Sequence, residues 1–126
     1  MNEDVGKLLL RLGLGGVFLW FGIDKFVHPE IWLNYIPEWF PMLVSEGLFI
    51  NLLGIVESLI GFFVLVGFYS QIAAGIAALM LIPIIFSLGY NEIMVRDVGL
   101  FFLAVGIAVL GSGRYSLIGI HGGRKE

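Results

Sequence analysis

Four long apolar stretches, separated by polar or glycine-containing breaks, make up most of the chain. They cover residues 5–26, 48–68, 71–88 and 93–111. About 20 helical residues, at about 1.5 Å each, cross the hydrocarbon core of a bilayer, which is about 30 Å thick. The pattern therefore predicts four membrane-spanning helices. The break between the second and third is only two or three residues long, so these two helices are expected to be antiparallel neighbours.

Composition supports the same class. Hydrophobic residues make up 59% of the chain, charged residues 13%, and the mean hydropathy is +0.98. Soluble domains have about 45–50% apolar and about 25% charged residues. We therefore expect an all-α integral membrane protein, with residues 1–126 forming a single antiparallel four-helix domain. The lipid bilayer is its first partner, and a homo-oligomer is compatible with the sequence.

Other classes of function lack the residues they need. The chain has no cysteine, which excludes disulfides and cysteine-ligated iron–sulfur clusters. Its net charge is −3 and it has no long basic run, so nucleic-acid binding is not expected. His28 and His121 fall on opposite sides of the predicted bundle, and no metal-ligand spacing occurs. The chain is therefore expected to hold no metal and no redox centre of its own.

The longest connection, residues 27–47, is rich in aromatic side chains. It carries Trp32, Tyr35, Trp39 and Phe40. Tryptophan and tyrosine favour the headgroup level of a bilayer, so this segment is expected to lie along the membrane surface. Two roles stay open: an anchoring cap over the bundle, or a docking surface for a partner or the mouth of a quinone site.

The basic residues predict an orientation. With four helices, both termini lie on one side of the membrane, and that side carries five lysines and arginines against two on the other. The five are Lys7, Arg11, Arg114, Arg124 and Lys125, and the two are Lys25 and Arg96. By the positive-inside rule, we expect a multi-pass protein of the cell membrane with both termini in the cytoplasm.

One charge, Glu57, interrupts the second apolar stretch near its centre. A carboxylate at mid-membrane costs about 2.5 kcal/mol or more unless it is protonated, paired or hydrated. Gly54 and Gly61 share its helix face and allow close packing, so Glu57 is expected to face the bundle. Its estimated depth makes Arg11 the leading partner. The alternative is a neutral Glu57 that accepts or donates a proton.

The first helix carries charges at both ends of one face. Arg11, Gly15, Phe18, Gly22 and Lys25 fall on that face, which is expected to point at other helices. Whether Arg11 and Lys25 reach into the bundle or extend to the headgroups stays open.

Four charges gather where the first helix ends and the fourth begins. Asp24 and Lys25 close the first, and Arg96 and Asp97 open the fourth. Adjacent residues point about 100° apart on a helix. We therefore expect Arg96 and Asp97 to pair with Asp24 and Lys25 across the helices and not with each other.

The order of these features resembles the DoxX/DoxD family of small four-helix membrane proteins. The similarity covers nearly the whole chain and rests on the run from Arg11 to Lys25, Glu57 in mid-helix, Arg96-Asp97, and Gly111-Ser-Gly113 before Ser116-Leu117. The residues it carries over are Arg11, Gly22, Lys25, Glu57 and Arg96. One position departs from the family: where many members have an acid after the closing Ser-Leu, this chain has Ile118.

The resemblance implies a link to respiratory quinone chemistry, through members that are a small subunit of a terminal quinol oxidase or the large subunit of a thiosulfate:quinone oxidoreductase. Two hypotheses follow. In the first, the chain is an accessory subunit beside oxidoreductase partner subunits: Glu57 handles a quinol proton, and Arg11 or Lys25 stabilises charge on the oxygen. In the second, it is a non-catalytic scaffold, assembly or lipid-binding protein whose charges hold the helices in register. Whether any turnover belongs to this chain stays open.

Overall fold

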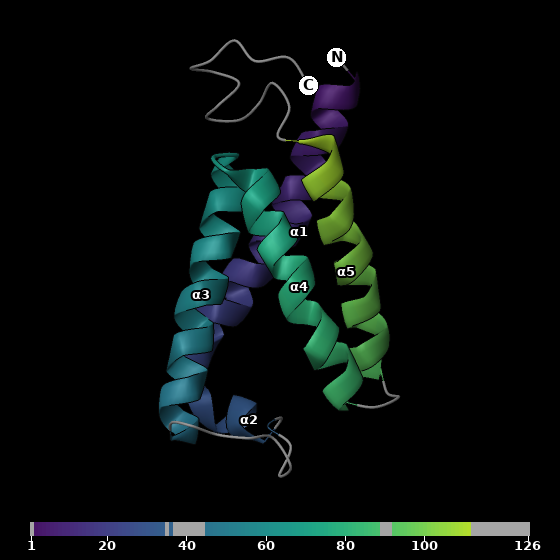
Figure 1. The fold of residues 1–126 in the computed structure, drawn as a ribbon. Coiled ribbons are helices and arrows are strands. Elements are labelled where there is room, and N and C mark those ends of the chain that lie inside the picture. The colour runs from purple at the N-terminus through teal and green to yellow at the C-terminus, as the bar shows by residue number, and fades with distance from the viewer. Residues whose placement is uncertain (1, 35, 37–44, 89–91, 112–126) are drawn as a thin grey trace.

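The structure, a computed structural model, describes residues 2–34, 36, 45–88 and 92–111 (Figure 1). Its helices are α1 (Asn2–Val27), α2 (Pro29–Leu33), α3 (Glu46–Val66), α4 (Ser70–Leu88) and α5 (Glu92–Leu110). The bounds of the four long helices differ from the predicted ones by at most three residues. The prediction of an all-α four-helix membrane protein is confirmed.

Some residues singled out in the sequence lie outside the described part of the chain. They are Tyr35, Trp39, Phe40, Ser112, Gly113, Arg114, Ser116, Leu117, Ile118, His121, Arg124 and Lys125.

Three of the helices are long and apolar enough to cross a membrane. These spans are Glu3–Val27, Glu46–Val66 and Glu92–Leu110, and the apolar part of α4, Ser70–Phe86, is shorter. Pro83 lies inside α4. A proline removes one backbone hydrogen bond, which membrane helices tolerate when neighbouring groups satisfy the freed carbonyl. The chain is a multi-pass membrane protein.

The ends of α3 follow from local sequence. Ser45 caps its start, because the Ser45 Oγ accepts a hydrogen bond from the Leu48 N–H at 3.2 Å. Gly67 ends it at φ 77°, a left-handed conformation that glycine adopts without strain, and its N–H donates to the Phe63 carbonyl at 3.0 Å. The chain then turns into α4 within three residues, so α3 and α4 are antiparallel.

Glycines bring α1 and α3 into backbone contact. A Cβ added at Gly61 would lie 2.5 Å from the Leu19 nitrogen and 2.7 Å from the Gly15 carbonyl oxygen. A Cβ added at Gly54 would lie 3.0 Å from the Gly22 carbonyl oxygen. Small residues permit this approach where no hydrophobic force separates protein from lipid. The two helices are antiparallel, with Gly15 level with Gly61 and Gly22 level with Gly54.

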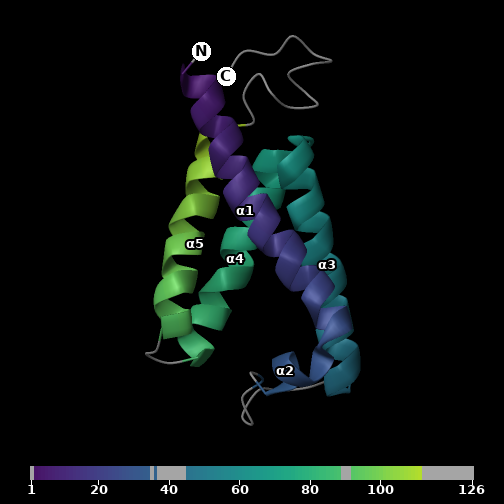
Figure 2. The same ribbon diagram turned by 180° about the vertical axis from the view of Figure 1, so that it is seen from behind.

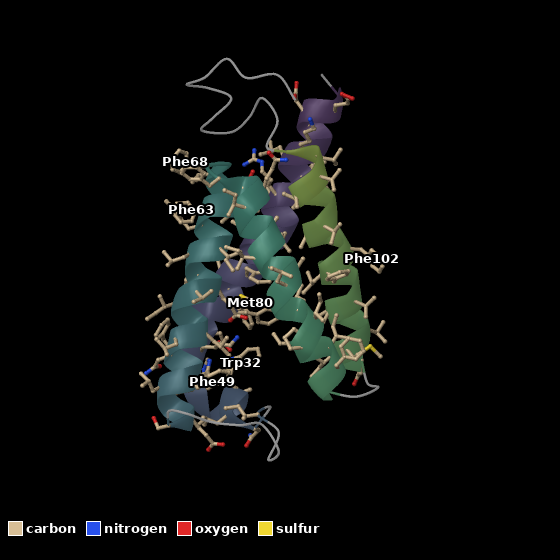
Figure 3. All side chains as sticks on the ribbon, in the orientation of Figure 1. Trp32, Phe49, Phe63, Phe68, Met80 and Phe102 are labelled. Atoms are coloured by element: carbon tan, nitrogen blue, oxygen red, sulfur yellow. The ribbon has the colours of Figure 1, made fainter. Side chains whose placement is uncertain are left out.

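The long helices form two pairs, α1 with α3 and α4 with α5. In Figures 1 and 2 the pairs converge near the start of α4 and diverge toward α2. At the converging end, the Gln71 side-chain amide of α4 donates to the Ala108 carbonyl of α5 at 2.8 Å. The buried core lies between the pairs, and α4 contributes mainly alanines to it. Its members are Leu14, Phe18, Ile60, Val64, Ala73, Ala74, Ala77, Ala78, Leu81, Ala104 and Ile107. Larger side chains, including Phe63, Met80 and Phe102 in Figure 3, surround this core or point outward.

Candidate functional site

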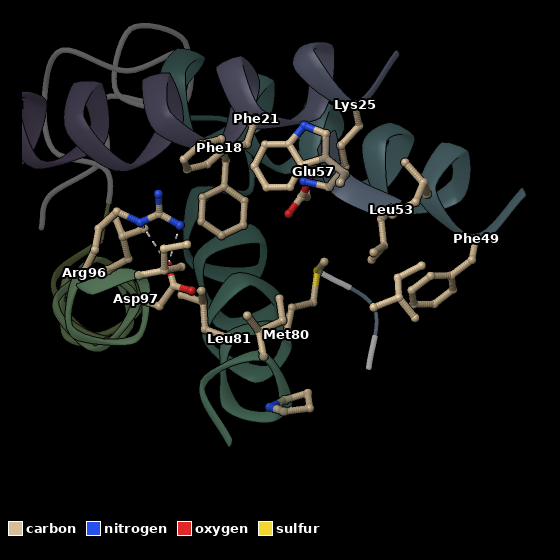
Figure 4. A pocket seen from close by; sticks show the side chains of 17 residues that line it. Phe18, Phe21, Lys25, Phe49, Leu53, Glu57, Met80, Leu81, Arg96 and Asp97 are labelled. Atoms are coloured by element: carbon tan, nitrogen blue, oxygen red, sulfur yellow. Dashed lines mark hydrogen bonds and ion pairs between the residues drawn. The ribbon is translucent and has the colours of Figure 1, made fainter. Parts of the chain in front are cut away.

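A pocket of about 300 Å³ lies where the two helix pairs diverge (Figure 4). Its volume is at the lower end of the range for small-molecule sites, about 300–1,000 Å³. Every helix contributes to its lining. Four lining side chains are charged, namely Lys25, Glu57, Arg96 and Asp97, and the other thirteen are apolar or aromatic. The pocket therefore combines an apolar wall with a few charged groups.

Lys25 and Glu57 form a buried ion pair in this wall. The Lys25 Nζ lies 2.5 Å from the Glu57 Oε1, and their side chains are only 6% and 10% exposed. A helical side chain leans toward the N-terminus of its own helix. Because α1 and α3 are antiparallel, Lys25 leans into the membrane and Glu57 leans toward α2, so the two side chains meet. The prediction that Glu57 faces the bundle is confirmed.

Glu57 retains hydrogen-bonding capacity beyond the ion pair. An ionised carboxylate accepts about four hydrogen bonds. Within the described part of the chain, the Lys25 ammonium contacts the buried Glu57 Oε1, and no other group donates a hydrogen bond to that oxygen. A carboxylate in this state can accept a hydrogen bond from a ligand that enters the pocket.

Trp32 of α2 covers the Lys25 side of the site. The Lys25 Nζ lies 3.9 Å from the centre of the Trp32 ring, a cation–π contact. The Trp32 indole N–H donates to the Asp24 Oδ2 at 3.0 Å, which fixes the ring. The sequence singled out Trp32 only as an aromatic of the membrane surface. Its spacing of eight residues from Asp24 carries no standard motif, so its contact with Lys25 was missed.

His28, which lies outside the membrane span, contacts the same Asp24 carboxylate that holds Trp32. Its Nδ1–H donates to the Asp24 Oδ1 at 2.8 Å, and the imidazole is half exposed. This hydrogen bond raises the pKa of His28 above its ordinary value, because it favours the protonated ring. Asp24 therefore joins His28 and Trp32, and the prediction that it pairs with Arg96 is wrong.

Arg96 and Asp97 pair with each other. The prediction that they pair with residues of another helix is wrong. The Arg96 Nε and Nη2 donate to the Asp97 Oδ1 at 3.2 and 3.1 Å. The flexible stem of arginine spans the 100° between adjacent helical positions, which the prediction ignored. The guanidinium also lies 4.7 Å from the centre of the Phe21 ring, so Arg96 faces α1.

The predicted Arg11–Glu57 pair is also wrong. Arg11 is fully buried, and its Nη1 donates to the carbonyls of Val64 and Leu65 at 3.3 and 2.8 Å, where α3 ends. The helix register places Arg11 level with Leu65, eight residues and about 12 Å from Glu57. Arg11 therefore stabilises the C-terminal carbonyls of α3, where a cation is favoured.

Replacing Arg11 by methionine is expected to lower the free energy of unfolding by about 1–3 kcal/mol, because one buried and one partly buried carbonyl lose a charged donor. Thermal unfolding of both proteins in the same detergent, with the remaining folded fraction read by size-exclusion chromatography, measures the change. Lys7→Met, one helical turn away, is the matched control for loss of a cation from α1. An Arg11→Met protein as stable as the Lys7→Met protein would show that Arg11 does not hold the end of α3.

Other observations limit what the site can hold. Among the described residues, no group of three histidine, aspartate or glutamate side chains could bind a metal ion. Of the six charged residues that the sequence offered as site candidates, the structure brings Lys25, Glu57, Arg96 and Asp97 to the pocket. Asp24 is not in the pocket lining and accepts a hydrogen bond from Trp32, and Arg11 lies at the C-terminal end of α3.

These features define a small multi-pass membrane protein with a charged, otherwise apolar pocket between two helix pairs. The sequence model of the DoxX family matches residues 6–89, and the chain belongs to the DoxX family. The matched range includes Lys25 and Glu57, whereas Arg96 and Asp97 on α5 lie beyond it. No curated protein and no solved structure gives a match.

Proposed function

We propose that this chain binds a membrane quinone in the pocket and acts as an accessory subunit of a quinone-linked respiratory oxidoreductase, of the terminal quinol oxidase or thiosulfate:quinone oxidoreductase type. The observation that carries the proposal is the buried Lys25–Glu57 pair in the wall of an apolar pocket. An ion pair that only fixes the helix register needs no cavity beside it. An ion pair that contacts a ligand needs a cavity in which the ligand can bind.

The charges of the pocket favour a neutral ligand. Lys25 and Arg96 balance Glu57 and Asp97, so the four groups have no net charge when ionised. An ion that entered would leave an uncompensated charge in a low-dielectric environment, which is costly. A quinone head is neutral, apolar over its faces and polar at its oxygens, which matches an apolar wall with charged groups at a few points.

The chain's own residues supply proton handling at this site. Glu57 accepts a hydrogen bond from a quinol hydroxyl and takes its proton, and the Lys25 ammonium stabilises the charge that develops on the ring oxygen. Oxidation of a bound quinol releases two protons and two electrons: Glu57 takes one proton, the second passes to water, and the electrons pass to a redox centre of a partner subunit. The predicted orientation, with both termini in the cytoplasm, would place the pocket in the outer half of the membrane.

Binding of a short-chain quinol tests the proposal. Under anaerobic conditions, we expect decylubiquinol to bind the purified protein saturably, and Glu57→Gln to weaken binding about 10- to 100-fold, because a hydrogen bond to a charged group contributes about 1.5–3 kcal/mol. Equilibrium dialysis in detergent measures both. Glu46→Gln, at the exposed start of the same helix, is the control and should bind like wild type.

The opposite result would favour the scaffold or lipid-binding hypothesis. If a folded wild-type protein shows no saturable quinol binding, the pocket does not serve quinones. If Glu57→Gln binds as tightly as Glu46→Gln, Glu57 is not the residue that contacts the quinol.

A further inference from the structure

We propose that the pocket holds one ring at two opposite edges, with the Lys25–Glu57 pair at one oxygen and the Arg96–Asp97 pair at the other. This inference rests on the proposed function and assigns Arg96 and Asp97 to the second oxygen of a ring whose two oxygens are in para positions, as in the 1,4-quinones and their hydroquinones. The site then discriminates against rings that have one oxygen, or two oxygens that are not opposite.

Both pairs approach the same aromatic ring of the protein. The Lys25 Nζ lies 5.8 Å from the centre of the Phe21 ring, and the Arg96 Cζ lies 4.7 Å from it. The two cationic groups are therefore at most 10.5 Å apart, the sum of these two distances. Figure 4 shows them on different sides of the pocket, with Phe21 labelled between them.

One para-dioxygenated ring is long enough to reach both cations. Its two oxygens lie about 5 Å apart, the width of the ring plus two C=O bonds of about 1.2 Å. A hydrogen bond of about 2.8 Å at each oxygen extends the reach to about 11 Å between donors. A ring with a single oxygen contacts only one pair and leaves the other without a ligand.

Each pair offers both a donor and an acceptor, so it suits either redox form of the ligand. The Lys25 ammonium and the Arg96 guanidinium donate to quinone carbonyls, and the Glu57 and Asp97 carboxylates accept from quinol hydroxyls. Asp97 is 3% exposed, and both of its hydrogen bonds from Arg96 go to Oδ1, which leaves further acceptor capacity. Neither redox form leaves an oxygen without a complementary partner.

The two pairs come from different halves of the molecule. Lys25 and Glu57 are on α1 and α3, whereas Arg96 and Asp97 are on α5. A ring bound at both edges therefore links the diverging helix pairs, and the apolar faces of the ring meet the side chains between them, such as Phe18, Met80 and Leu81.

Three naphthalene ligands of one ring size test the inference under anaerobic conditions. The expected result is that wild type binds 1,4-dihydroxynaphthalene at least about 10-fold more tightly than 1-naphthol or 1,3-dihydroxynaphthalene, because a second hydrogen bond to a charged group contributes at least about 1.5 kcal/mol. Arg96→Gln and Asp97→Asn should each remove most of this preference. Binding of 1-naphthol should stay within about twofold, since the Lys25–Glu57 pair remains.

The outcomes separate this inference from the proposed function. If wild type binds the 1,4-diol and 1-naphthol equally, the two-edge contact is wrong while quinol binding stands. If wild type binds the 1,3-diol as tightly as the 1,4-diol, the requirement for opposite edges is wrong. If decylubiquinol and all three ligands fail to bind, the proposed function itself fails. The wild-type comparison needs no variant to fold, and Lys7→Gln, on α1 far from the pocket, should keep the wild-type preference.

Discussion

Replacing Lys25 by methionine is expected to lower the free energy of unfolding by about 3–5 kcal/mol, the range found when one partner of a buried ion pair is removed. The reason is the position of Glu57, whose side chain is 10% exposed and whose ion-pair partner is Lys25. Methionine keeps most of the length of the side chain but removes the charge. Glu57 is then left as a buried carboxylate without a counter-ion. It can lower the cost of this buried charge only by taking up a proton or by moving.

A double-mutant cycle distinguishes pairing from packing. Lys25→Met with Glu57→Leu removes both charges, and we expect the double variant to regain most of the lost stability, because two apolar side chains can replace a buried pair at little cost. Equilibrium unfolding in mixed detergent micelles gives the four free energies. Lys7→Met is the control for removing a buried lysine of α1. Additive losses in the double variant would mean that Lys25 and Glu57 do not stabilise each other.

Replacing Gly61 by alanine is expected to separate α1 from α3. The new Cβ would lie 2.5 Å from the Leu19 nitrogen and 2.7 Å from the Gly15 oxygen, and both are backbone atoms that cannot rotate away. Overpacking of this kind costs about 1–3 kcal/mol and occasionally more. The shift should also lengthen the Lys25–Glu57 contact, because Gly22 and Gly54 hold those two residues together through the same crossing.

Gly16→Ala is the matched control for Gly61→Ala. Gly16 is in α1 next to Gly15, but a Cβ added there meets nothing within 4 Å. The control should be neutral or slightly stabilising, because alanine favours a helix over glycine by about 1 kcal/mol. Both variants are measured by thermal unfolding in the same detergent as wild type. Equal stability of the two variants would show that the α1–α3 crossing tolerates a larger separation than its geometry indicates.

Sequence reasoning predicted the inward face of α1 and the inward direction of Glu57, and the structure confirms both. Arg11, Gly15, Phe18, Gly22 and Lys25 were placed on one inward face of α1, and all five are buried. Helical periodicity and small residues fix such a face locally, without knowledge of the partner helix. The sequence left open whether Arg11 and Lys25 reach into the bundle or extend to the headgroups. Both side chains lie inside the bundle.

The pairing of the charges was not predictable in the same way. Depth along the membrane made Arg11 the leading partner of Glu57, yet the register of α1 against α3 places it at Leu65 instead. Arg96 and Asp97 were assigned to other helices by their helical angle, and side-chain flexibility overrides that angle. Distances between side chains on different helices depend on the register of one helix against the other, which hydropathy does not encode.

For this protein, the sequence by itself determined the membrane class, the four long helices and the inward direction of Glu57, because each depends on local composition and helical period. It also determined the family, because the family model matches the chain over residues 6–89. Only the tertiary structure decided that Lys25 pairs with Glu57, that the Trp32 ring lies against the Lys25 ammonium, and that a pocket opens beside the pair. The physical reason is that these contacts depend on antiparallel register and on the divergence of two helix pairs. Both are set by packing between segments far apart in the chain.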